Sequence, residues 1–454
     1  MKNKSLNRLS IITMVVVLLF LQVVPTFASN EEPDIVSRAA VVIDSKTKEV
    51  LYEKNMEEIR TPASLTKMLT AILVVENLDL KKEIVAPKEA IGIKGNNMNL
   101  KKGEKLTVEE LLNAMLIYSA NDAAIALGVE VAGSLENFYQ LMNEKARVIG
   151  CKNSNFISAN GLTNNIKHHS TAYDMALIAA KSMEYKEIRK IVKKIDYTIE
   201  ATNKSDERTF KTTNRLLYDK KHTYKLDGKN ETLKYDLAIG VKTGLMNSSG
   251  HCLAAAAKKD GTEVISVVLG SSEDLARFEE SKTLLMYAFD NFKTYEAIPK
   301  DEAVGKVKIK RGAKLSAEVF VNGGAYVTLP KTTENSVVTT EVVLKDDIEA
   351  PVKKGTVVGY VKIKDAGTLV DKVDVSIGES VKKGGPWTIL GISNLMMIII
   401  ALVILALLVL LITMKTSKKR LRKKRELAAK RAREEKILEL ARQRAEKKKR
   451  EWPY

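Results

Sequence analysis

The chain has 454 residues, with 74 Lys and Arg against 56 Asp and Glu and a formal net charge of +18. A hydrophobic fraction of 45% excludes a wholly disordered chain, and two cysteines exclude a disulfide framework and a Cys-rich zinc site. Four histidines leave little for a His-based metal site, and we expect neither a metal nor a cofactor.

The excess positive charge lies at the two ends of the chain. Residues 415–454 hold 18 Lys and Arg against six Glu, and Lys2, Lys4 and Arg8 add three more cations. Residues 9–414 therefore carry only +3. Because the middle is nearly balanced, the charge does not indicate a nucleic-acid-binding globular domain, and we expect no nucleic acid partner.

Residues 1–28 have the features of a secretory signal peptide. The three cations at the start precede the apolar stretch 11–24, and Thr26-Phe27-Ala28 then supplies small residues before a cleavage point. This stretch of 14 residues is short for a membrane span. We expect cleavage after Ala28 and export of the mature protein, with an uncleaved anchor as the alternative.

Residues 35–295 combine strand and helix patterns. A hairpin is predicted over 40–53, because β-type runs flank a short polar turn. Helical patterns follow at residues 62–75, 111–118, 123–132, 135–149, 171–183 and 274–292, and strand patterns at 237–242, 250–258 and 263–269. We expect an α+β domain in which strands from both sequence ends share one antiparallel sheet.

Residues 297–381 have a different pattern of short β-type runs. They are separated by Gly, Pro, Asn and Asp, and lie at residues 306–310, 317–321, 337–344, 356–364 and 370–377. This pattern predicts a small all-β domain, joined by a short linker, Gly384-Gly385-Pro386, to the next segment.

Residues 395–414 form an uncharged run of 20 residues, LMMIIIALVILALLVLLITM. As a helix it covers about 30 Å, the hydrocarbon thickness of a bilayer. A buried core helix is the alternative, but Lys418-Lys419-Arg420 follows at once, as in a stop-transfer signal. We expect a single-pass protein with its folded part outside the cytoplasm.

The tail, residues 415–454, then lies inside the cell by the positive-inside rule. Its mixture of Ala, Leu, Glu, Lys and Arg predicts a charged helix that contacts anionic lipid head groups. A specific partner of the tail, or a nucleic acid, is the alternative.

Ser64-Leu65-Thr66-Lys67 begins the first predicted helix, where Thr61 suits the N-cap and Pro62 the first helical position. A Ser and a Lys three residues apart on a helix lie side by side. Free N–H groups in the first turn favour developing negative charge. A neutral Lys67 can take the Ser64 proton and make an acylating nucleophile.

The same Ser-x-x-Lys spacing occurs twice more, at Ser45…Lys48 and Ser380…Lys383. The first lies in the hairpin turn and the second before the membrane linker. Neither begins an apolar helix, so we discount both.

Two further motifs carry suitable polar groups. Ser119-Ala120-Asn121 lies between the second and third helices, where a hydroxyl can relay protons and an amide can hold a carbonyl. Lys242-Thr243-Gly244 ends a strand, and the glycine lets a ligand backbone approach. Ser158-Ala159-Asn160 in a loop repeats the first motif, and Lys211-Thr212-Thr213 matches the second without the glycine.

In this order the motifs match the Ser-x-x-Lys, Ser-x-Asn and Lys-Thr-Gly set of penicillin-recognising serine enzymes. With the segments 160–162, 172–176 and 214–217, the chain resembles the low-molecular-mass penicillin-binding proteins that act as D-alanyl-D-alanine carboxypeptidases. The resemblance runs from about residue 35 to residue 381, and implies a β-lactamase-like catalytic domain followed by the small β domain.

The resemblance implies three catalytic residues. Ser64 is the acyl-ester nucleophile, Lys67 its general base, and Ser119 relays a proton towards the leaving group. Residues that bind substrate are implied as well: Asn121, Lys242, Thr243, Gly244, Leu245 and Arg277. Lys242, Thr243 and Arg277 hold the carboxylate, and the backbone N–H groups of Ser64 and Leu245 form the oxyanion hole.

The expected function is a membrane-anchored serine carboxypeptidase that removes the terminal D-alanine of peptidoglycan stem pentapeptides. The implied partners are the stem peptide, β-lactam antibiotics and membrane lipid. A transpeptidase or endopeptidase, and a non-catalytic β-lactam sensor or scaffold, stay open. A class A β-lactamase is disfavoured because its Glu-x-x-Leu-Asn pattern is absent between Asn121 and Lys242.

Three details are less typical. Leu245 stands where the family more often has an aromatic residue or His, which leaves the substrate preference open. Cys151 and Cys252 are expected to be free, with Cys252 facing inward from a strand. His168-His169 is interpreted as a loop pair rather than a metal site.

Overall fold

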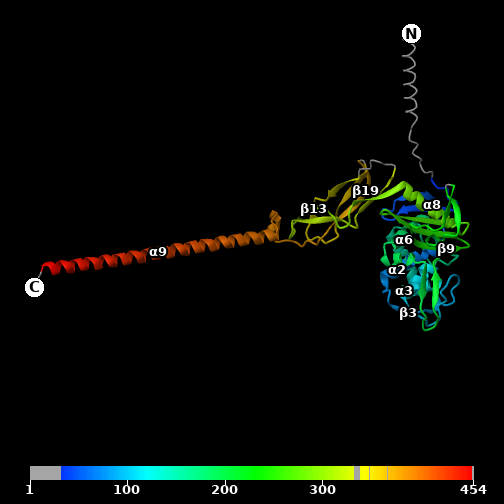
Figure 1. Cartoon of the computed structure of the whole chain (residues 1–454), viewed down its shortest axis with the longest axis horizontal. Helices are drawn as coiled ribbons and strands as arrows, with labels where there is room; N and C mark the ends of the chain where they lie inside the picture. Colours follow the sequence, from blue (N-terminus) through cyan, green and yellow to red (C-terminus); the bar gives the residue numbers. More distant parts are fainter. Residues whose placement is uncertain (1–31, 227, 332–337, 347, 366, 452–454) are drawn as a thin grey trace, which may run out of the picture. The chain divides into compact units, whose positions relative to one another are not determined.

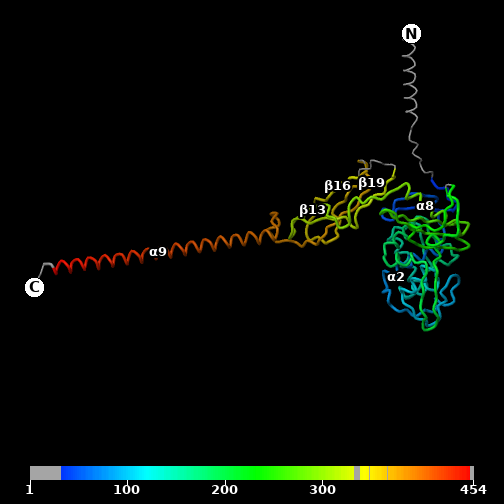
Figure 2. Tube along the Cα trace, viewed as in Figure 1, coloured from blue at the N-terminus to red at the C-terminus, as the bar shows by residue number. Residues whose placement is uncertain are grey.

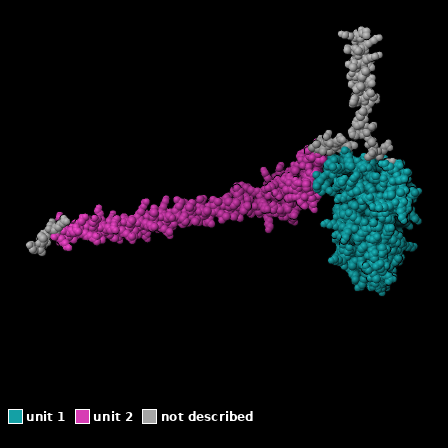
Figure 3. Space-filling model, in the orientation of Figure 1, with its two compact units in different colours: residues 1–296, 326–336 teal, residues 297–325, 337–454 magenta. Residues whose placement is uncertain are grey.

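The computed structural model describes residues 32–226, 228–331, 338–346, 348–365 and 367–451. The predicted signal peptide lies outside these residues. The chain divides into two compact units, residues 1–296 with 326–336 and residues 297–325 with 337–454, which Figure 3 colours separately.

The first unit is built on a five-stranded antiparallel sheet in the order β2-β1-β11-β10-β9. The strands are β1 (Ala39–Asp44), β2 (Val50–Lys54), β9 (Ala238–Met246), β10 (Gly250–Lys259) and β11 (Thr262–Ser271). Strands from both sequence ends therefore share one sheet, which confirms the predicted α+β fold. The edge strand β9 carries Lys242-Thr243-Gly244, as expected.

The sheet is buried on both faces. Along β1, Ala39, Val41 and Ile43 belong to one hydrophobic cluster, and the alternating residues Ala40 and Val42 belong to another. This follows from the two-residue period of a strand. Helix α6 (Ala172–Ser182) packs against β1 and β11 on one face, α8 (Ala276–Asn291) packs against β10 and β11 on the other, and α7 (Lys186–Val192) packs against β9. The remaining helices of this unit are α2 (Lys67–Asn77), α3 (Val108–Asn113), α4 (Asn121–Ala132) and α5 (Leu135–Ile149).

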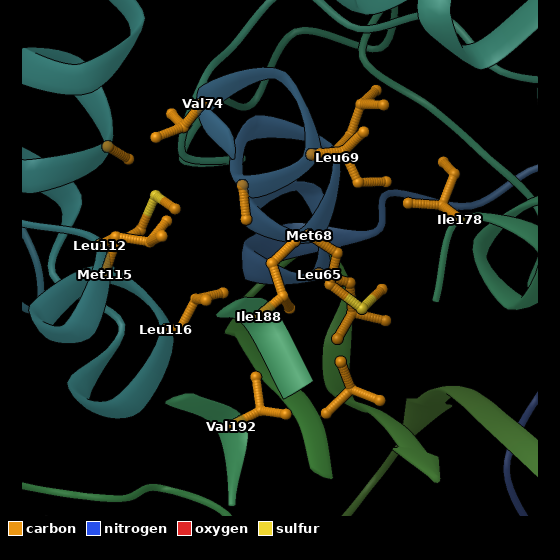
Figure 4. Packing of buried hydrophobic residues seen from close by; sticks show 14 of the residues in the cluster. Leu65, Met68, Leu69, Val74, Leu112, Met115, Leu116, Ile178, Ile188 and Val192 are labelled. Atoms are coloured by element: carbon orange, nitrogen blue, oxygen red, sulfur yellow. The ribbon is translucent and has the colours of Figure 1, made fainter. Parts of the chain in front are cut away.

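Helix α2 is the centre of the larger cluster. Leu65, just before it, and Met68 and Leu69 within it are fully buried, and side chains from α3, α6 and α7 surround them (Figure 4). Burial all round fixes the position of this helix, and so of the Ser64 turn before it.

The sequence missed several short elements in this unit. These are the hairpins β3–β4 (Glu83–Val85, Lys105–Thr107), β5–β6 (Asp196–Ile199, Arg208–Lys211) and β7–β8 (Thr223–Leu226, Lys229–Thr232), and helix α7. Strands of three or four residues have too few positions to show alternation.

In the second unit a six-stranded sheet has the order β16-β18-β19-β14-β13-β17. Its strands are β13 (Ala303–Lys310), β14 (Ser316–Val321), β16 (Val338–Leu344), β17 (Ile348–Glu349), β18 (Val357–Asp365) and β19 (Thr368–Ile377). Two further strands, β12 (Phe292–Ile298) and β15 (Ala325–Pro330), pair with each other, lie mostly in the first unit and were not predicted.

A 3₁₀ turn, η5 (Pro386–Leu390), leads into α9 (Asn394–Glu451), one uninterrupted helix of 58 residues (Figures 1 and 2). The helix has an apolar window of mean hydropathy 3.6, none of it buried by protein. Its length and composition suit a membrane span, and the charged tail continues the same helix.

Candidate active site

Ser64 lies in η1 (Ala63–Thr66), the 3₁₀ turn that leads into α2. Its neighbour Ala63 has φ = +49°, a conformation that L-residues rarely adopt. The hydroxyl of Thr66 donates to the Ala63 carbonyl at 2.8 Å, and Gly161 lies against that carbonyl so closely that a Cβ would be 1.9 Å from its oxygen. These contacts hold the backbone at the half-buried Ser64 in one geometry.

Lys67 connects three parts of the site. Its Nζ lies 2.9 Å from Ser64 Oγ, 2.7 Å from Asn121 Oδ1 and 2.9 Å from the Asn160 carbonyl oxygen. The amide of Asn121 is oriented by a 2.9 Å bond from its Nδ2 to the Lys94 carbonyl, so Oδ1 faces the amine. Two of the three partners are therefore pure acceptors.

This arrangement suits a neutral amine. A neutral Lys67 has two N–H donors, which Asn121 Oδ1 and the Asn160 carbonyl accept, and one lone pair left for the hydroxyl proton of Ser64. Complete burial, and then the charge of Lys242, lower the pKa of Lys67 well below its usual value. The geometry and the electrostatics are both those that a general base would need.

Ser119 lies at the junction of η3 (Ala114–Tyr118) and α4, two residues before Asn121. It is 6% exposed and has the left-handed conformation φ = +71°. Non-glycine residues in this region cost about 1–3 kcal/mol and cluster at functional sites. The turn that it makes brings Asn121 to Lys67.

Strand β9 closes the other side of the site. A Cβ at Gly244 would lie 3.3 Å from Ser64 N and 3.2 Å from Ala63 Cβ, so the glycine lets the strand approach the nucleophile turn closely. Thr243 Oγ1 lies 2.6 Å from Thr213 Oγ1. The side chain of Leu245 is 55% exposed at the end of the strand.

Lys242 is the second buried lysine of the site, and its Nζ donates to the Thr243 carbonyl at 3.0 Å. Burial, and then the charge of Arg277, lower the pKa of Lys242 to about 7. A carboxylate beside it would stabilise its charged form.

Arg277 lies behind β9. It donates to the carbonyl oxygens of Gly244 at 2.7 Å and Cys252 at 3.2 Å, and also bonds to the carboxylate of Asp274. Cys252 is buried on β10, as predicted, opposite Gly244. Arg277 thus contributes charge close to Lys242 while it fixes the strand that carries the motif.

Three residues at the site were not singled out in the sequence as site residues. Asn160 of the repeated motif contributes a backbone carbonyl to Lys67, and Thr213 of the incomplete second motif contacts Thr243. His168 lies in a loop, as expected, but is fully buried, 3.0 Å from Thr66 Oγ1. Asn160 and Thr213 could have been suspected from the sequence, because each lies in a partial repeat of a site motif.

The hydrogen bonds of His168 assign its tautomer. Its Nδ1 accepts the Ile157 N–H at 3.2 Å, so Nε2 carries the hydrogen and donates to Thr66 Oγ1. Thr66 in turn donates to Ala63. Burial, with a smaller contribution from His169, lowers the pKa of His168 to about 4, which keeps the ring neutral.

The site therefore holds a hydroxyl beside a buried lysine amine whose pKa is lowered, with a second buried lysine on an edge strand. It can acylate Ser64 with an anionic substrate that carries an electrophilic carbonyl. Among the residues that the structure describes, no group of three or more His, Cys, Asp or Glu side chains is placed to hold a metal.

Comparison with known proteins agrees with this chemistry. Residues 26–273 match the family model described as D-alanyl-D-alanine carboxypeptidase, and residues 292–383 match that of the C-terminal domain of penicillin-binding protein 5. The carboxypeptidase DacF of Bacillus subtilis is 33% identical, over 78% of this chain and 88% of its own length. DacC of Escherichia coli is 31% identical, over 81% and 90%.

Solved structures show the same fold. Penicillin-binding protein 5 of Haemophilus influenzae has a TM-score of 0.62 and 27% identity, over 78% of this chain and 99% of that one. A DD-transpeptidase of Streptomyces has a TM-score of 0.51 and 29% identity, over 57% of this chain and 100% of its own. The resemblance seen in the motifs is confirmed, and the chain belongs to the D-alanyl-D-alanine carboxypeptidase family of serine peptidases, the low-molecular-mass penicillin-binding proteins.

Proposed function

We propose that the chain removes the terminal D-alanine of peptidoglycan stem peptides through an acyl-enzyme on Ser64. Ser64 Oγ attacks the carbonyl carbon of the penultimate D-alanine while Lys67 Nζ takes the hydroxyl proton. The peptide bond then breaks, the free D-alanine leaves with a proton relayed through Ser119, and water hydrolyses the ester. β-Lactams acylate the same oxygen.

The single observation that carries this proposal is the position of Lys67 Nζ. It lies 2.9 Å from Ser64 Oγ, with both of its N–H donors occupied by acceptors of the protein. Only the lone pair remains for the serine proton. This is the arrangement that a general base needs before substrate arrives.

The substrate carboxylate is assigned to Lys242 and Thr243 on β9, with Asn121 positioning the peptide and Gly244 admitting its backbone. Arg277 supports this site from behind the strand, through the Gly244 carbonyl and through its charge. The N–H groups of Ser64 and Leu245 are assigned to the oxyanion hole. Two buried cations near one strand suit an anionic peptide end.

The test is incubation of the full chain with a muropeptide that ends in D-Ala-D-Ala, and measurement of released D-alanine. Ser64→Ala is the control and should release none. Mass spectrometry after penicillin treatment should place the adduct on the peptide that contains Ser64. Acylation without any D-alanine release would instead indicate a β-lactam sensor or scaffold.

A second candidate function is transpeptidation, because a structural relative carries that name. The acyl-enzyme is the same, and only the acceptor differs: an amine in place of water. Adding an amine acceptor such as glycine to the assay distinguishes them. Hydrolysed product should dominate for a carboxypeptidase, and the aminolysed product for a transpeptidase.

The anchoring follows from α9, and we assign its topology as follows. Residues 35–295, the catalytic domain, and 297–381, the β domain, lie outside, and 415–454 inside the cell. The 18 cations of the tail support this orientation, because their transfer across a membrane is costly. A tag after Tyr454 should resist protease in intact, wall-stripped cells, and its digestion there would reverse the assignment.

A further inference from the structure

The membrane helix is fixed to the β domain at its first residue. The N–H of Asn394 donates to the Ala313 carbonyl at 3.3 Å, and its Oδ1 accepts from Trp387 Nε1 at 3.0 Å and from the Gly385 N–H at 3.2 Å. The uncharged run begins at the next residue, Leu395. The loop that contains Ala313 therefore lies level with the boundary of the bilayer.

The turn before the helix supports this depth. Within η5, Ile389 is 68% exposed and Leu390 is 80% exposed, and Trp387 lies beside them. Exposed aliphatic side chains next to a tryptophan suit the interface between head groups and acyl chains. The end of the β domain that meets α9 is thus at the membrane surface.

Three backbone segments meet at this end. The Ala313 N–H donates to the Lys382 carbonyl and the Gly384 N–H to the Arg311 carbonyl, both at 2.9 Å. The Lys354 N–H donates to Ser380 Oγ at 2.9 Å, which joins the third segment. We call these segments, residues 310–314, 349–354 and 379–383, the basic collar.

The basic collar carries seven Lys and Arg against two Glu. Arg311 pairs with Glu349 at 2.9 Å, and Lys314 with Glu379 at 2.5 Å. Of the other five cations, four have exposed side chains and no ion-pair partner among the residues that the structure describes: Lys353, Lys354, Lys382 and Lys383. Residues 345–347, which precede the second of these segments in the sequence, carry a net charge of −1.

We propose that the basic collar docks on anionic phospholipid head groups in the leaflet where α9 enters the bilayer. Its free lysines lie in two loops whose backbones are hydrogen-bonded to the loop of Ala313, and that loop bonds to the first residue of the span. Lipid phosphates at the bilayer surface attract such cations over a Debye length of about 8 Å. Each such cation gains from a negative membrane surface. The β domain is then held at the bilayer by its own face as well as by the helix.

A lipid surface fits better than a soluble polyanion. The four free lysines come from two loops around the base of one helix, and apolar side chains lie beside them. A soluble polyphosphate could bind the lysines but would leave Ile389 and Leu390 exposed to water. A bilayer can bind the lysines with its head groups and bury the two aliphatic side chains among its acyl chains.

The test places the full chain in nanodiscs of phosphatidylcholine alone, or with phosphatidylglycerol. An amine-acylating reagent then modifies exposed lysines, and mass spectrometry measures the rates. In anionic discs the reaction rates should fall at least about threefold for the four collar lysines, Lys353, Lys354, Lys382 and Lys383. High salt should remove the protection. Reference lysines of the same domain should change little: Lys306, Lys362, Lys364 and Lys372.

A variant tests whether the collar holds the domain. A fluorophore on Thr368→Cys, an exposed position at the far end of β19, reports domain rotation by anisotropy. Changing the four collar lysines to Gln should lower the anisotropy in anionic discs to its value in phosphatidylcholine. The matched control changes the four reference lysines to Gln, and should keep the high anisotropy.

Three outcomes overturn the proposal. One is equal modification rates in both kinds of disc, and another is equal protection of collar and reference lysines. The third is that soluble polyphosphate protects the collar in phosphatidylcholine discs as well as anionic lipid does. If the chain did not insert into either kind of disc, α9 would not be a membrane span and this proposal would fail. The catalytic assignment would be unaffected.

Discussion

The charge of Lys242 lowers the pKa of Lys67, so the residue assigned to bind substrate also prepares the residue assigned as base. Both side chains are buried, and burial is the larger cause of each shift. Lys67 has to be neutral to act, whereas Lys242 has to be charged to bind a carboxylate. The two requirements give the site its expected dependence on pH.

Changing Lys242 to Gln removes one positive charge next to Lys67. The pKa of Lys67 should then rise, because the neutral form is less favoured. The acid limb of the acylation rate, measured at saturating β-lactam over a range of pH, should move to higher pH. An unchanged limb with a lower rate would mean that Lys242 acts only by binding.

For the wild-type chain, the affinity for carboxylate substrates should fall as pH rises through about 7. The pKa of Lys242 is about 7 in the free protein, so its charged form is lost above that pH. KM for a D-Ala-D-Ala peptide, measured from pH 6 to 9, should rise on the alkaline side. A flat KM would place the carboxylate on another cation.

Changing Lys67 to Arg keeps the charge but removes the base, because a guanidinium does not lose its proton in proteins. General-base catalysis typically contributes about 10²–10⁴-fold, so the rate of penicillin acylation should fall by that amount. Labelling with a fluorescent penicillin measures it. Near-normal labelling of this variant would contradict the assigned role.

Ser119 has a left-handed conformation that costs free energy in any residue but glycine. Ser119→Gly should keep or raise the stability, by about 1 kcal/mol at most once the extra chain entropy of glycine is included. Ser119→Ala keeps the strain. Both variants lose the hydroxyl and should lose turnover, so thermal denaturation separates strain from catalysis.

His168 is a positioning residue that acts through Thr66 and Ala63. His168→Phe keeps the ring packed against Phe156 but removes the donor, and turnover should fall on the order of tenfold, because the nucleophile turn is displaced. His168→Gln restores a donor and should recover part of kcat. A loss of thermal stability with kcat unchanged in the Phe variant would show a purely structural role.

The main elements of the fold could be predicted because local signals agreed. Helix α5 begins and ends where expected, since Ser134 caps its start and Gly150 adopts the left-handed conformation at its end. Thr107 and Glu110 form a capping box at the start of α3. The short hairpins could not be predicted, because strands of three or four residues show no clear alternation. The pairing of β12 with β15 could not be predicted, because it joins strands that are not neighbours in the chain.

For the candidate site, the sequence predicted which side chains come together, but not which backbone groups join them. Ser64, Lys67 and Asn121 meet as expected, since each motif supplies a side chain with its own chemistry. The carbonyl of Asn160 and the burial of His168 were missed, because any residue offers a carbonyl and a histidine pair is common in loops. Only the fold brings them to the nucleophile.

Helix α9 extends the span without a break, and its 58 residues measure about 87 Å. The eight cations of residues 415–425 precede the first acidic residue of the tail, Glu426. From residue 442 onward the chain is basic again, about 40 Å beyond the end of the uncharged run. At physiological ionic strength a charge at that distance does not sense the bilayer. In the topology that we propose, a straight helix would therefore keep the proximal part of the tail within electrostatic reach of lipid head groups and the distal part in the surrounding solution.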